Sequence, residues 1–348
     1  MTSEYFIGFG LALIISLGVT PLVRKLAFRI GAVDKPSSRK VHAQPIPRLG
    51  GVGIVTAFLV PFVILADFDR ALLGLLLGIV ILFSVGLIDD LKRLRARTKL
   101  FWQLIAAGVV LAGGIGIVYV TNPFGGVINL DGWRLAVTLG PLSFNILPLA
   151  NAVSLLWIVG MVNTVNFLDG LDGLAAGVSA IACLVLFTLA LTPGFHNVTV
   201  ALLAMILLGA LLGFLPYNFF PSRIFMGDSG AYVLGLILAL LAIYAGSKIT
   251  IGVLVLGLAI IDALWTIIRR LVSGRSPFKP DRSHLHHLLH DWGVLSHREV
   301  VLLFYLITAL IAVTTIFLGA RATGLLLLIL MLATISLARI ISPKRAIR

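Results

Sequence analysis

The sequence has little charge and almost no cysteine, and both shortages restrict the class of protein. Only 12% of its 348 residues are charged and 59% are hydrophobic, whereas about a quarter of the residues in soluble domains are charged. A globule of this composition would lack a polar surface, so we expect the excess apolar residues to face lipid. The one cysteine, Cys183, excludes an internal disulfide and any metal cluster built from several cysteines.

Long apolar runs are abundant, and their lengths match membrane-spanning helices. Such a helix needs about 20 mainly apolar residues to cross the hydrocarbon core of a bilayer. Eleven runs qualify, at 5–23, 49–66, 71–88, 100–120, 147–165, 173–192, 197–216, 230–246, 249–268, 300–319 and 322–341. They occupy most of the chain. We therefore predict an all-α, polytopic integral membrane protein with about eleven transmembrane helices and a single domain, 1–348.

The distribution of Lys and Arg predicts the orientation of these helices. One set of loops comprises 24–48, 89–99, 166–172, 217–229, 269–299 and the tail after 341, with Arg339 at its edge. This set carries 23 basic residues and the opposite set carries 4. Because basic loops face the cytoplasm, we expect the N-terminus outside and an active site on the cytoplasmic loops. The longest outer segment, 121–146, has hairpin-like turn residues, and we assign it no chemistry.

Carboxylates occur at the membrane edge and inside one predicted span. Asp89 and Asp90 are adjacent, so their charges repel unless a cation or a proton relieves them. They end a span, and the alternatives are a solvated helix end and a site for a divalent cation or a phosphate. Asp262 lies inside the span 249–268 and needs a partner there, such as Arg269, Arg270 or an amide. We interpret Asp262 as structural or as a support for the site.

The segment 163–173 has the strongest signal for chemistry. Asn163, Asn166 and Asp169 are spaced by three residues, so a helix would place them on one face. Asp172 continues the same spacing. Oxygen ligands of this kind suit Mg2+, which often bridges to substrate phosphates. A glycine-rich turn with Asp and Asn caps is the alternative, but four such residues at an apolar boundary favour a functional site.

The segment 217–230 introduces the eighth predicted span and places Asp228 at its first turn. A negative charge is favourable at that position, so Asp228 could be only a helix cap. A helix N-terminus also binds phosphate, and Phe225 offers a ring face to a base. This segment alone does not decide between the two interpretations.

The segment 281–290 holds four histidines in the most basic loop. His286 and His290 have a helical zinc-ligand spacing, but we disfavour zinc because no third ligand has an evident spacing. Imidazoles beside Arg282 and Lys279 more naturally bind phosphate oxygens or transfer a proton.

Together these motifs resemble the polyprenyl-phosphate N-acetylhexosamine-1-phosphate transferases, over nearly the whole chain. The resemblance runs from the segments 34–36 and 47–51 to the His-rich segment 281–287, which resembles the branch that uses N-acetylglucosamine (GlcNAc). It implies that UDP-N-acetylhexosamine and a polyprenyl phosphate give polyprenyl-diphospho-sugar and UMP. The cofactor would be Mg2+, with Mn2+ as an alternative. In such phosphoryl transfer the protein mainly neutralises charge and aligns the reactants.

The resemblance also implies a role for each site residue. Asn166 and Asp228 would ligate the metal, Asp89 would deprotonate or orient the lipid phosphate with Asp90 supporting the site, and Lys99 would hold phosphate charge. On the nucleotide side, Asp169 and Asp172 would make contact, Asn218 would help fix the substrate, and Phe225 would stack on uracil. The diphosphate and sugar would be bound by Arg282, His284, His286 and His287. The hypothesis requires Asn166 and Asp228 to lie within reach of one ion.

The expected partners are a UDP-N-acetylhexosamine, a polyprenyl phosphate and membrane lipid, with no nucleic acid and with a homodimer left open. The expected location is the inner, or plasma, membrane with the site facing the cytoplasm, at the first membrane step of envelope glycopolymer synthesis. Two alternatives remain: the phospho-MurNAc-pentapeptide transferases of peptidoglycan synthesis, and a polytopic transporter of anionic substrates. A transporter would place its ionisable groups near the bilayer midplane, whereas nearly all carboxylates here lie at loops or helix ends.

Overall fold

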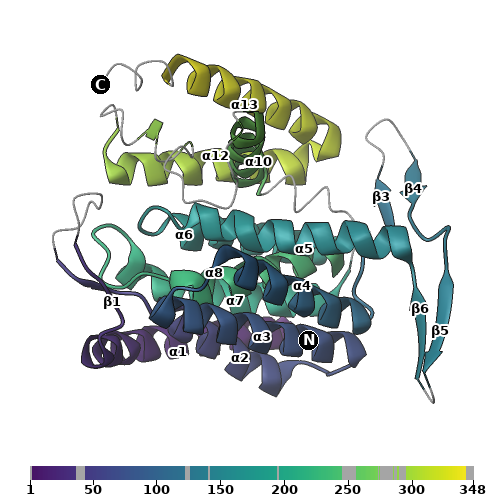
Figure 1. Cartoon of the computed structure of the whole chain (residues 1–348), viewed down its shortest axis with the longest axis horizontal. Coiled ribbons are helices and arrows are strands. Elements are labelled where there is room, and N and C mark those ends of the chain that lie inside the picture. Colours follow the sequence, from purple (N-terminus) through teal and green to yellow (C-terminus); the bar gives the residue numbers. More distant parts are fainter. Residues whose placement is uncertain are drawn as a thin grey trace.

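The chain folds into a bundle of long helices with three short β-ladders (Figure 1). The computed structural model describes residues 2–36, 44–121, 126–139, 142–193, 196–244, 256–272, 274, 285, 288–289 and 295–341. Its helices are α1 (Thr2–Ile30), α2 (Gly50–Leu65), α3 (Arg70–Lys92), α4 (Ala96–Ala112), α5 (Pro148–Leu168), α6 (Leu174–Ala190), α7 (Val198–Asn218), α8 (Gly227–Tyr244), α10 (Gly257–Val272), α12 (His297–Phe317) and α13 (Gly319–Ile341).

The strands form three antiparallel pairs. They are β1 (Val33–Asp34) with β2 (Ile46–Pro47), β3 (Tyr119–Thr121) with β4 (Val127–Asn129), and β5 (Leu135–Leu139) with β6 (Leu142–Ile146). The registers align Val33 with Pro47, Tyr119 with Asn129, and Leu135 with Ile146. The last two pairs confirm the hairpin-like character predicted for 121–146.

Six of the helices are long and apolar enough to cross a membrane: α1, α3, α5, α7, α8 and α12. The chain is therefore an all-α, multi-pass membrane protein, as the composition predicted. Each of the eleven apolar runs overlaps one helix of the described chain. The predicted run 100–120 is wrong at its end, because α4 stops at Ala112. Gly113 and Gly114 follow, and Gly114 has a φ of 98°.

The interior is built on α7 and α8, which are buried over most of their length. A helix that is apolar all round can face lipid or lie inside a bundle, and the packing of these two helices places them inside. α7 packs on α1, α2 and α6, while α8 packs on α2, α3 and α5. Small residues bring α1 and α7 close together: a Cβ added at Gly209 would lie 2.3 Å from the Phe9 carbonyl oxygen. Ser16 also donates a hydrogen bond to the Ala210 carbonyl, at 2.7 Å.

The order of the elements brings five helix termini to one end of the bundle. The C-terminal ends of α3, α5 and α7 meet the N-terminal ends of α4 and α8 there, and the hairpins β3–β4 and β5–β6 lie at the opposite end (Figure 1). α10, α12 and α13 form a group beside α5 and α6. The predicted site residues between Asp89 and Asp228, all of which are described, are thereby collected at the end away from the hairpins.

Candidate active site

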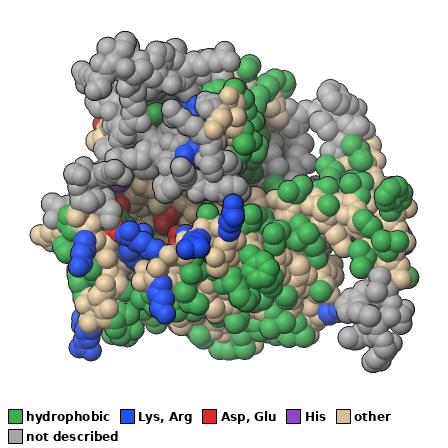
Figure 2. All heavy atoms as spheres, in the orientation of Figure 1, with side chains coloured by type: hydrophobic (Ala, Val, Ile, Leu, Met, Phe, Trp, Pro, Cys, Tyr) green, Lys and Arg blue, Asp and Glu red, His purple; other side chains and the backbone are tan. Residues whose placement is uncertain are grey.

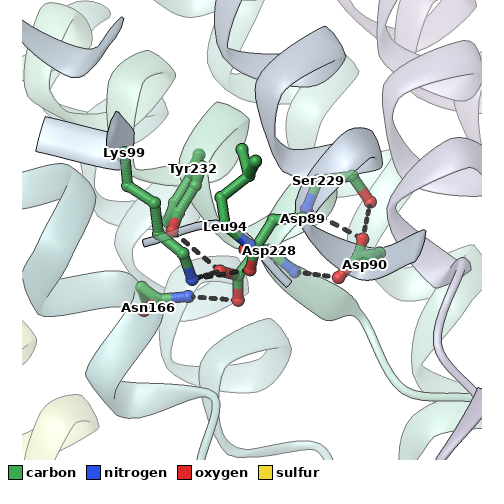
Figure 3. A network of polar contacts seen from close by, with 8 residues as sticks. All are labelled: Asp89, Asp90, Leu94, Lys99, Asn166, Asp228, Ser229 and Tyr232. Atoms are coloured by element: carbon green, nitrogen blue, oxygen red, sulfur yellow. Dashed lines mark hydrogen bonds and ion pairs between the residues drawn. The ribbon is translucent and has the colours of Figure 1, made fainter. Parts of the chain in front are cut away.

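Asp228 is the centre of a partly buried polar cluster, drawn in Figure 3. It lies in the first turn of α8 and accepts hydrogen bonds from three side chains. Its Oδ1 accepts from Asn166 Nδ2 on α5 at 3.0 Å. Its Oδ2 accepts from Lys99 Nζ on α4 at 2.8 Å and from the Tyr232 hydroxyl at 2.7 Å. Asn166 and Asp228 are thus in direct contact, as the shared-ion hypothesis required.

Asp89 joins this cluster through Lys99. The two side chains form an ion pair of 2.6 Å between Asp89 Oδ2 and Lys99 Nζ. The chain leaves α3 through Arg93 in a left-handed conformation, with φ at 54°, and the Leu94 amide then donates to the Asp89 carboxylate. This tight turn allows α4 to start near the end of α3. The Lys99 ammonium therefore bridges the carboxylates of Asp89 and Asp228.

Asp90 faces the other way and caps α8. The first amides of a helix have no partner within the helix, and here the Asp90 carboxylate accepts from the amides of Asp228 (2.8 Å) and Ser229 (3.1 Å). It also accepts from the Ser229 hydroxyl at 2.6 Å. The helix N-terminus considered above as a phosphate site is thus occupied by a carboxylate of this chain. Asp90 on α3 therefore caps α8 in this structure, and its supporting role in the reaction stays a prediction.

Gly227 is required at the start of α8 by both space and backbone conformation. Its φ is +75°, and an added Cβ would lie 2.3 Å from the Arg48 carbonyl oxygen and 2.6 Å from Asp90 Oδ2. The segment preceding α8 pairs with the 47–51 motif. The amides of Gly50 and Gly51 donate to the carbonyls of Phe225 (2.9 Å) and Met226 (2.7 Å).

The 47–51 motif also positions Phe225 through the backbone. The Phe225 amide donates to the Pro47 carbonyl at 2.8 Å, so both peptide groups of Phe225 are engaged. Its side chain is half-buried, between the buried side chains of Ile224 and Met226. Stacking of this ring on uracil stays a prediction.

A further pair of polar side chains joins α4 and α5, next to Lys99 and Asn166. Gln103 is one turn beyond Lys99, and Asn163 is nearly one turn before Asn166. Asn163 Nδ2 donates to Gln103 Oε1 and to the Val159 carbonyl, both at 2.8 Å. Gln103 is almost fully buried. The pair fixes the relative position of the two helices that supply Lys99 and Asn166, and the sequence interpretation missed Gln103.

The turn between α5 and α6, residues 169–173, lies against the same cluster. The Asp169 carboxylate accepts from the Gly227 amide. Burial raises the pKa of Asp169 well above its usual range, and the negative charges of Asp228, Asp90 and Asp172 act in the same direction. A cation bound nearby would favour the ionised form of this carboxyl group and lower its pKa.

Asp172 and Asn218 connect this turn to the segment after α7. Asp172 Oδ2 accepts from the Ser222 amide at 3.0 Å. Asn218 is buried; its Oδ1 accepts from the Gly173 amide at 3.1 Å, and its Nδ2 donates to the Ile224 carbonyl at 3.0 Å. Asn218 therefore joins two loops in this structure. Its contact with substrate stays a prediction, as does the contact of Asp172 with the nucleotide.

α12 supplies contacts to this turn that the sequence interpretation missed. The Asp172 amide donates to His297 Nε2 at 2.9 Å. The His297 ring stacks on Phe220, with centroids 4.4 Å apart. Ser296 and Glu299 form a capping box that fixes where α12 begins, and therefore where His297 lies. The capping box can be recognised in the sequence. The sequence near His297 does not indicate its partner Asp172, which lies 125 residues away.

The four predicted diphosphate and sugar ligands, Arg282, His284, His286 and His287, lie outside the described residues. Leu285, within the same segment, is described. Its amide donates to Asp262 Oδ1 at 2.7 Å, and both residues are buried. Asp262, interpreted from the sequence as structural or supporting, thus has a backbone partner in the His-rich segment.

The donor set fits a hard divalent cation. Asn166 supplies an amide and Asp228 a carboxylate, with the carboxylates of Asp89, Asp90 and Asp169 close by. Among the described residues, no group of three or more His, Cys, Asp or Glu side chains is placed to hold a metal by itself. Mg2+ usually takes one or two carboxylates and completes its shell with water and substrate phosphates.

The surface around the cluster has a mixed charge. Figure 2 shows Lys and Arg side chains around a hollow in which acidic side chains are visible. The loop between α3 and α4 contributes the exposed Arg93 and Arg95 to this end of the bundle. An anionic ligand would therefore meet basic groups at the rim and carboxylates with Lys99 inside.

Known proteins resemble this chain over most of its length. A family model described as glycosyl transferase family 4 matches residues 72–246. The probable undecaprenyl-phosphate N-acetylglucosaminyl 1-phosphate transferase of Bacillus subtilis (strain 168) is 35% identical, over 94% of this chain and 89% of the relative. The decaprenyl-phosphate N-acetylglucosaminephosphotransferase of Mycobacterium leprae is 35% identical, over 91% and 85%. A phospho-N-acetylmuramoyl-pentapeptide-transferase of Acetivibrio thermocellus is 30% identical, over 90% and 93%.

The fold and the polar cluster define a multi-pass membrane protein with a candidate active site at one end of its helical bundle. The near full-length matches add the chemistry: the chain belongs to glycosyl transferase family 4, among the polyprenyl-phosphate N-acetylhexosamine-1-phosphate transferases. The resemblance found in the sequence is confirmed at this level.

Proposed function

We propose that this chain transfers GlcNAc-1-phosphate from UDP-GlcNAc to a polyprenyl phosphate, with Mg2+ as cofactor. An oxygen of the lipid phosphate attacks the sugar-bearing phosphorus, the bond to the UMP oxygen breaks, and polyprenyl-diphospho-GlcNAc and UMP result. The observation that carries the proposal is the contact among Lys99, Asn166 and Asp228. Three distant segments place an ammonium, an amide and a carboxylate together where a diphosphate and a cation could bind.

Charge neutralisation is the main task in such a reaction, because both reactants are anions. Asn166 and Asp228 would hold the ion, which supplies positive charge to the diphosphate when it is bound. Lys99 would offer its ammonium to a phosphate oxygen. Asp89, paired with Lys99 at 2.6 Å, would orient the lipid phosphate, which is already mostly ionised at neutral pH.

The finer architecture belongs to the same proposal. Eleven membrane spans, an N-terminus outside and a site at the cytoplasmic edge would let one pocket reach both reactants. The nucleotide sugar would come from the cytoplasm, and the polyprenyl chain would stay in the bilayer. The ratio of 23 to 4 basic residues supports this orientation, and so does the grouping of the site residues at one end of the bundle. The reaction would then start a cell-envelope glycopolymer.

Transfer of phospho-MurNAc-pentapeptide is the second candidate, since relatives with that name are 30% identical to this chain. Two observations favour GlcNAc. The relatives named for GlcNAc transfer reach 36% identity, and the sequence of 281–287 resembles the GlcNAc branch.

The decisive experiment measures UMP release by the purified full-length chain in detergent. We expect release from UDP-GlcNAc only when polyprenyl phosphate and Mg2+ are both present, and none after chelation with EDTA. A panel of UDP-GlcNAc, UDP-GalNAc and UDP-MurNAc-pentapeptide identifies the donor. Release from the pentapeptide donor alone would replace the proposed donor, and no release from any donor would refute the enzymatic proposal.

Asp228→Asn tests the metal site with a nearly isosteric change. We expect activity to fall about a hundredfold or more, since even the groups that orient metal ligands are worth about 10–100-fold. Asp131→Asn is the matched control, because Asp131 forms an exposed ion pair with Arg134 in the hairpin region and should leave activity unchanged. Near-normal activity of Asp228→Asn would remove Asp228 from the metal site.

A further inference from the structure

We propose that His297 is a positioning residue that holds the turn 169–173 in the geometry that binds the nucleotide sugar. This inference rests on the proposed function, because it assigns His297 to the UDP side of that site. His297 itself lies beyond the carboxylate cluster and has no part in the mechanism described above.

The contacts of His297 fix the backbone of the turn. The ring is buried, with 7% of the residue exposed. Its Nε2 accepts from the Asp172 amide at 2.9 Å, so the neutral ring carries its proton on Nδ1. The ring that stacks on His297 is also held in place. Phe220 stacks with an angle of 24° between the two ring planes, and Arg298 donates to the Phe220 carbonyl at 3.0 and 3.2 Å.

Tyr305 holds the same turn from two helical turns further along α12. Positions 297 and 305 lie on one face of a helix, and the Tyr305 hydroxyl donates to the Gly173 carbonyl. The Tyr305 ring packs tightly on α6, because a Cβ added at Gly177 would fall 2.0 Å from it. Two polar side chains of α12 therefore bind the backbone of two consecutive residues of the turn, Asp172 and Gly173.

The turn 169–173 is in contact with the polar cluster around Asp228, so its position affects that cluster. Asp169, at its start, accepts from the Gly227 amide, next to Asp228. The far side of the turn is fixed by Asn218, whose Oδ1 accepts from the Gly173 amide, and by the Ser222 amide, which donates to Asp172. Without the acceptor from α12, the Asp172 amide would lose its partner at a partly buried position, which is costly. The turn would then move, and the Asp169 and Asp172 side chains with it.

The test compares two substitutions of His297. His297→Phe keeps a ring against Phe220 but has no acceptor, whereas His297→Gln restores an acceptor. We expect His297→Phe to raise the KM for UDP-GlcNAc about tenfold, the range for a lost buried hydrogen bond, with kcat and the KM for polyprenyl phosphate little changed. His297→Gln should recover most of the wild-type KM.

Several outcomes would overturn the inference. These are an unchanged KM for UDP-GlcNAc in His297→Phe, a loss confined to kcat, or a His297→Gln variant no better than His297→Phe. Tyr305→Phe provides a second route if His297→Phe does not fold, since it removes only the hydroxyl that donates to Gly173. It should raise the same KM, and an unchanged KM would count against the inference. If wild-type protein releases no UMP, the proposed function fails instead, which separates the two failures.

Discussion

The Asp228 carboxylate shows how single side chains set the electrostatics of the site. Its three donors come from α4, α5 and α8 itself, and the Lys99 ammonium also pairs with Asp89. Charges near the hydrocarbon region are costly unless they are paired. One Lys99 ammonium therefore offsets only part of the charge of the two carboxylates that it bridges, those of Asp89 and Asp228. The remaining negative charge explains why a divalent cation would be attracted here.

Asp169 should make stability depend on pH in an unusual direction. Its pKa in the folded chain is raised by burial and by neighbouring carboxylates from the ordinary value of 3.8. The folded state thus holds this proton more tightly than the unfolded state, so the contribution of Asp169 to stability is full below pH 3.8 and is lost as pH rises through the raised pKa. Asp169→Asn removes this dependence. We expect the Tm of wild type to fall by a few degrees relative to Asp169→Asn as the pH is raised from 4 to 8.

Thermal unfolding in detergent with EDTA measures this difference, because a bound cation would itself favour the ionised carboxylate. Asp131→Asn serves as control, since Asp131 is exposed in the hairpin region. A constant difference in Tm between wild type and Asp169→Asn across the pH range would contradict the assignment. We also expect Asp169→Asn to bind UDP-GlcNAc more weakly, so the more stable variant would be the less active one.

Among the helices, α8 depends most on its neighbours for where it begins. Its first amides are capped by Asp90 from α3. The segment just before it, Phe225 and Met226, forms backbone hydrogen bonds with the 47–51 motif. Gly51 and Gly86 both lie against this first turn: an added Cβ would fall 2.2 Å from the Gly230 nitrogen and 2.5 Å from Ser229 Cα, respectively. These close approaches explain why glycines surround the acidic cluster.

Gly51→Ala should therefore destabilise the protein. The new methyl group would meet backbone atoms that cannot rotate away, and overpacking of this kind costs about 1–3 kcal/mol. We expect a lower Tm in detergent and lower activity, because Asp228 moves with Gly230. Gly10→Ala is the matched control, since an added Cβ there has nothing within 4 Å. Equal Tm values for the two variants would show that the first turn of α8 has room to shift.

The helices could be predicted from the sequence because they depend on the residues of each segment alone. Apolar runs predicted the helices because burial in lipid is a property of each segment. The family resemblance implied that Asp89, Lys99, Asn166 and Asp228 belong to one site. The end of α4 was wrong because apolar residues continue past Gly114 into strand β3.

Four contributors were missed: Gln103, Tyr232, His297 and Tyr305. For Gln103, His297 and Tyr305 the reason is that their partners are distant in sequence. The Gln103–Asn163 pair joins residues 60 apart, and the Tyr305–Gly173 pair joins residues 132 apart. Such pairs have no periodicity that a single sequence could reveal. Tyr232 is the exception: it stands four residues after Asp228 on α8, so a helix starting at Gly227 would have predicted the contact.

The whole molecule has two different ends. The polar cluster, the exposed arginines of the α3–α4 loop and the turn 169–173 lie at one end, and the hairpins lie at the other. This polarity is what the proposed reaction needs, because its two reactants come from water and from lipid. It also means that the orientation in the membrane decides which compartment supplies the nucleotide sugar.

The orientation can be tested with introduced cysteines, because Cys183 is fully buried and should react little. Trp133→Cys places a thiol in the hairpin region, where Trp133 is 78% exposed, and Arg97→Cys places one at the exposed start of α4. If basic loops face the cytoplasm, a membrane-impermeant maleimide should label Trp133→Cys in intact cells. It should label Arg97→Cys only after permeabilisation, and the unmodified chain reports the background from Cys183. The reverse pattern would place the cluster on the outer face, where a cytoplasmic nucleotide sugar could not reach it.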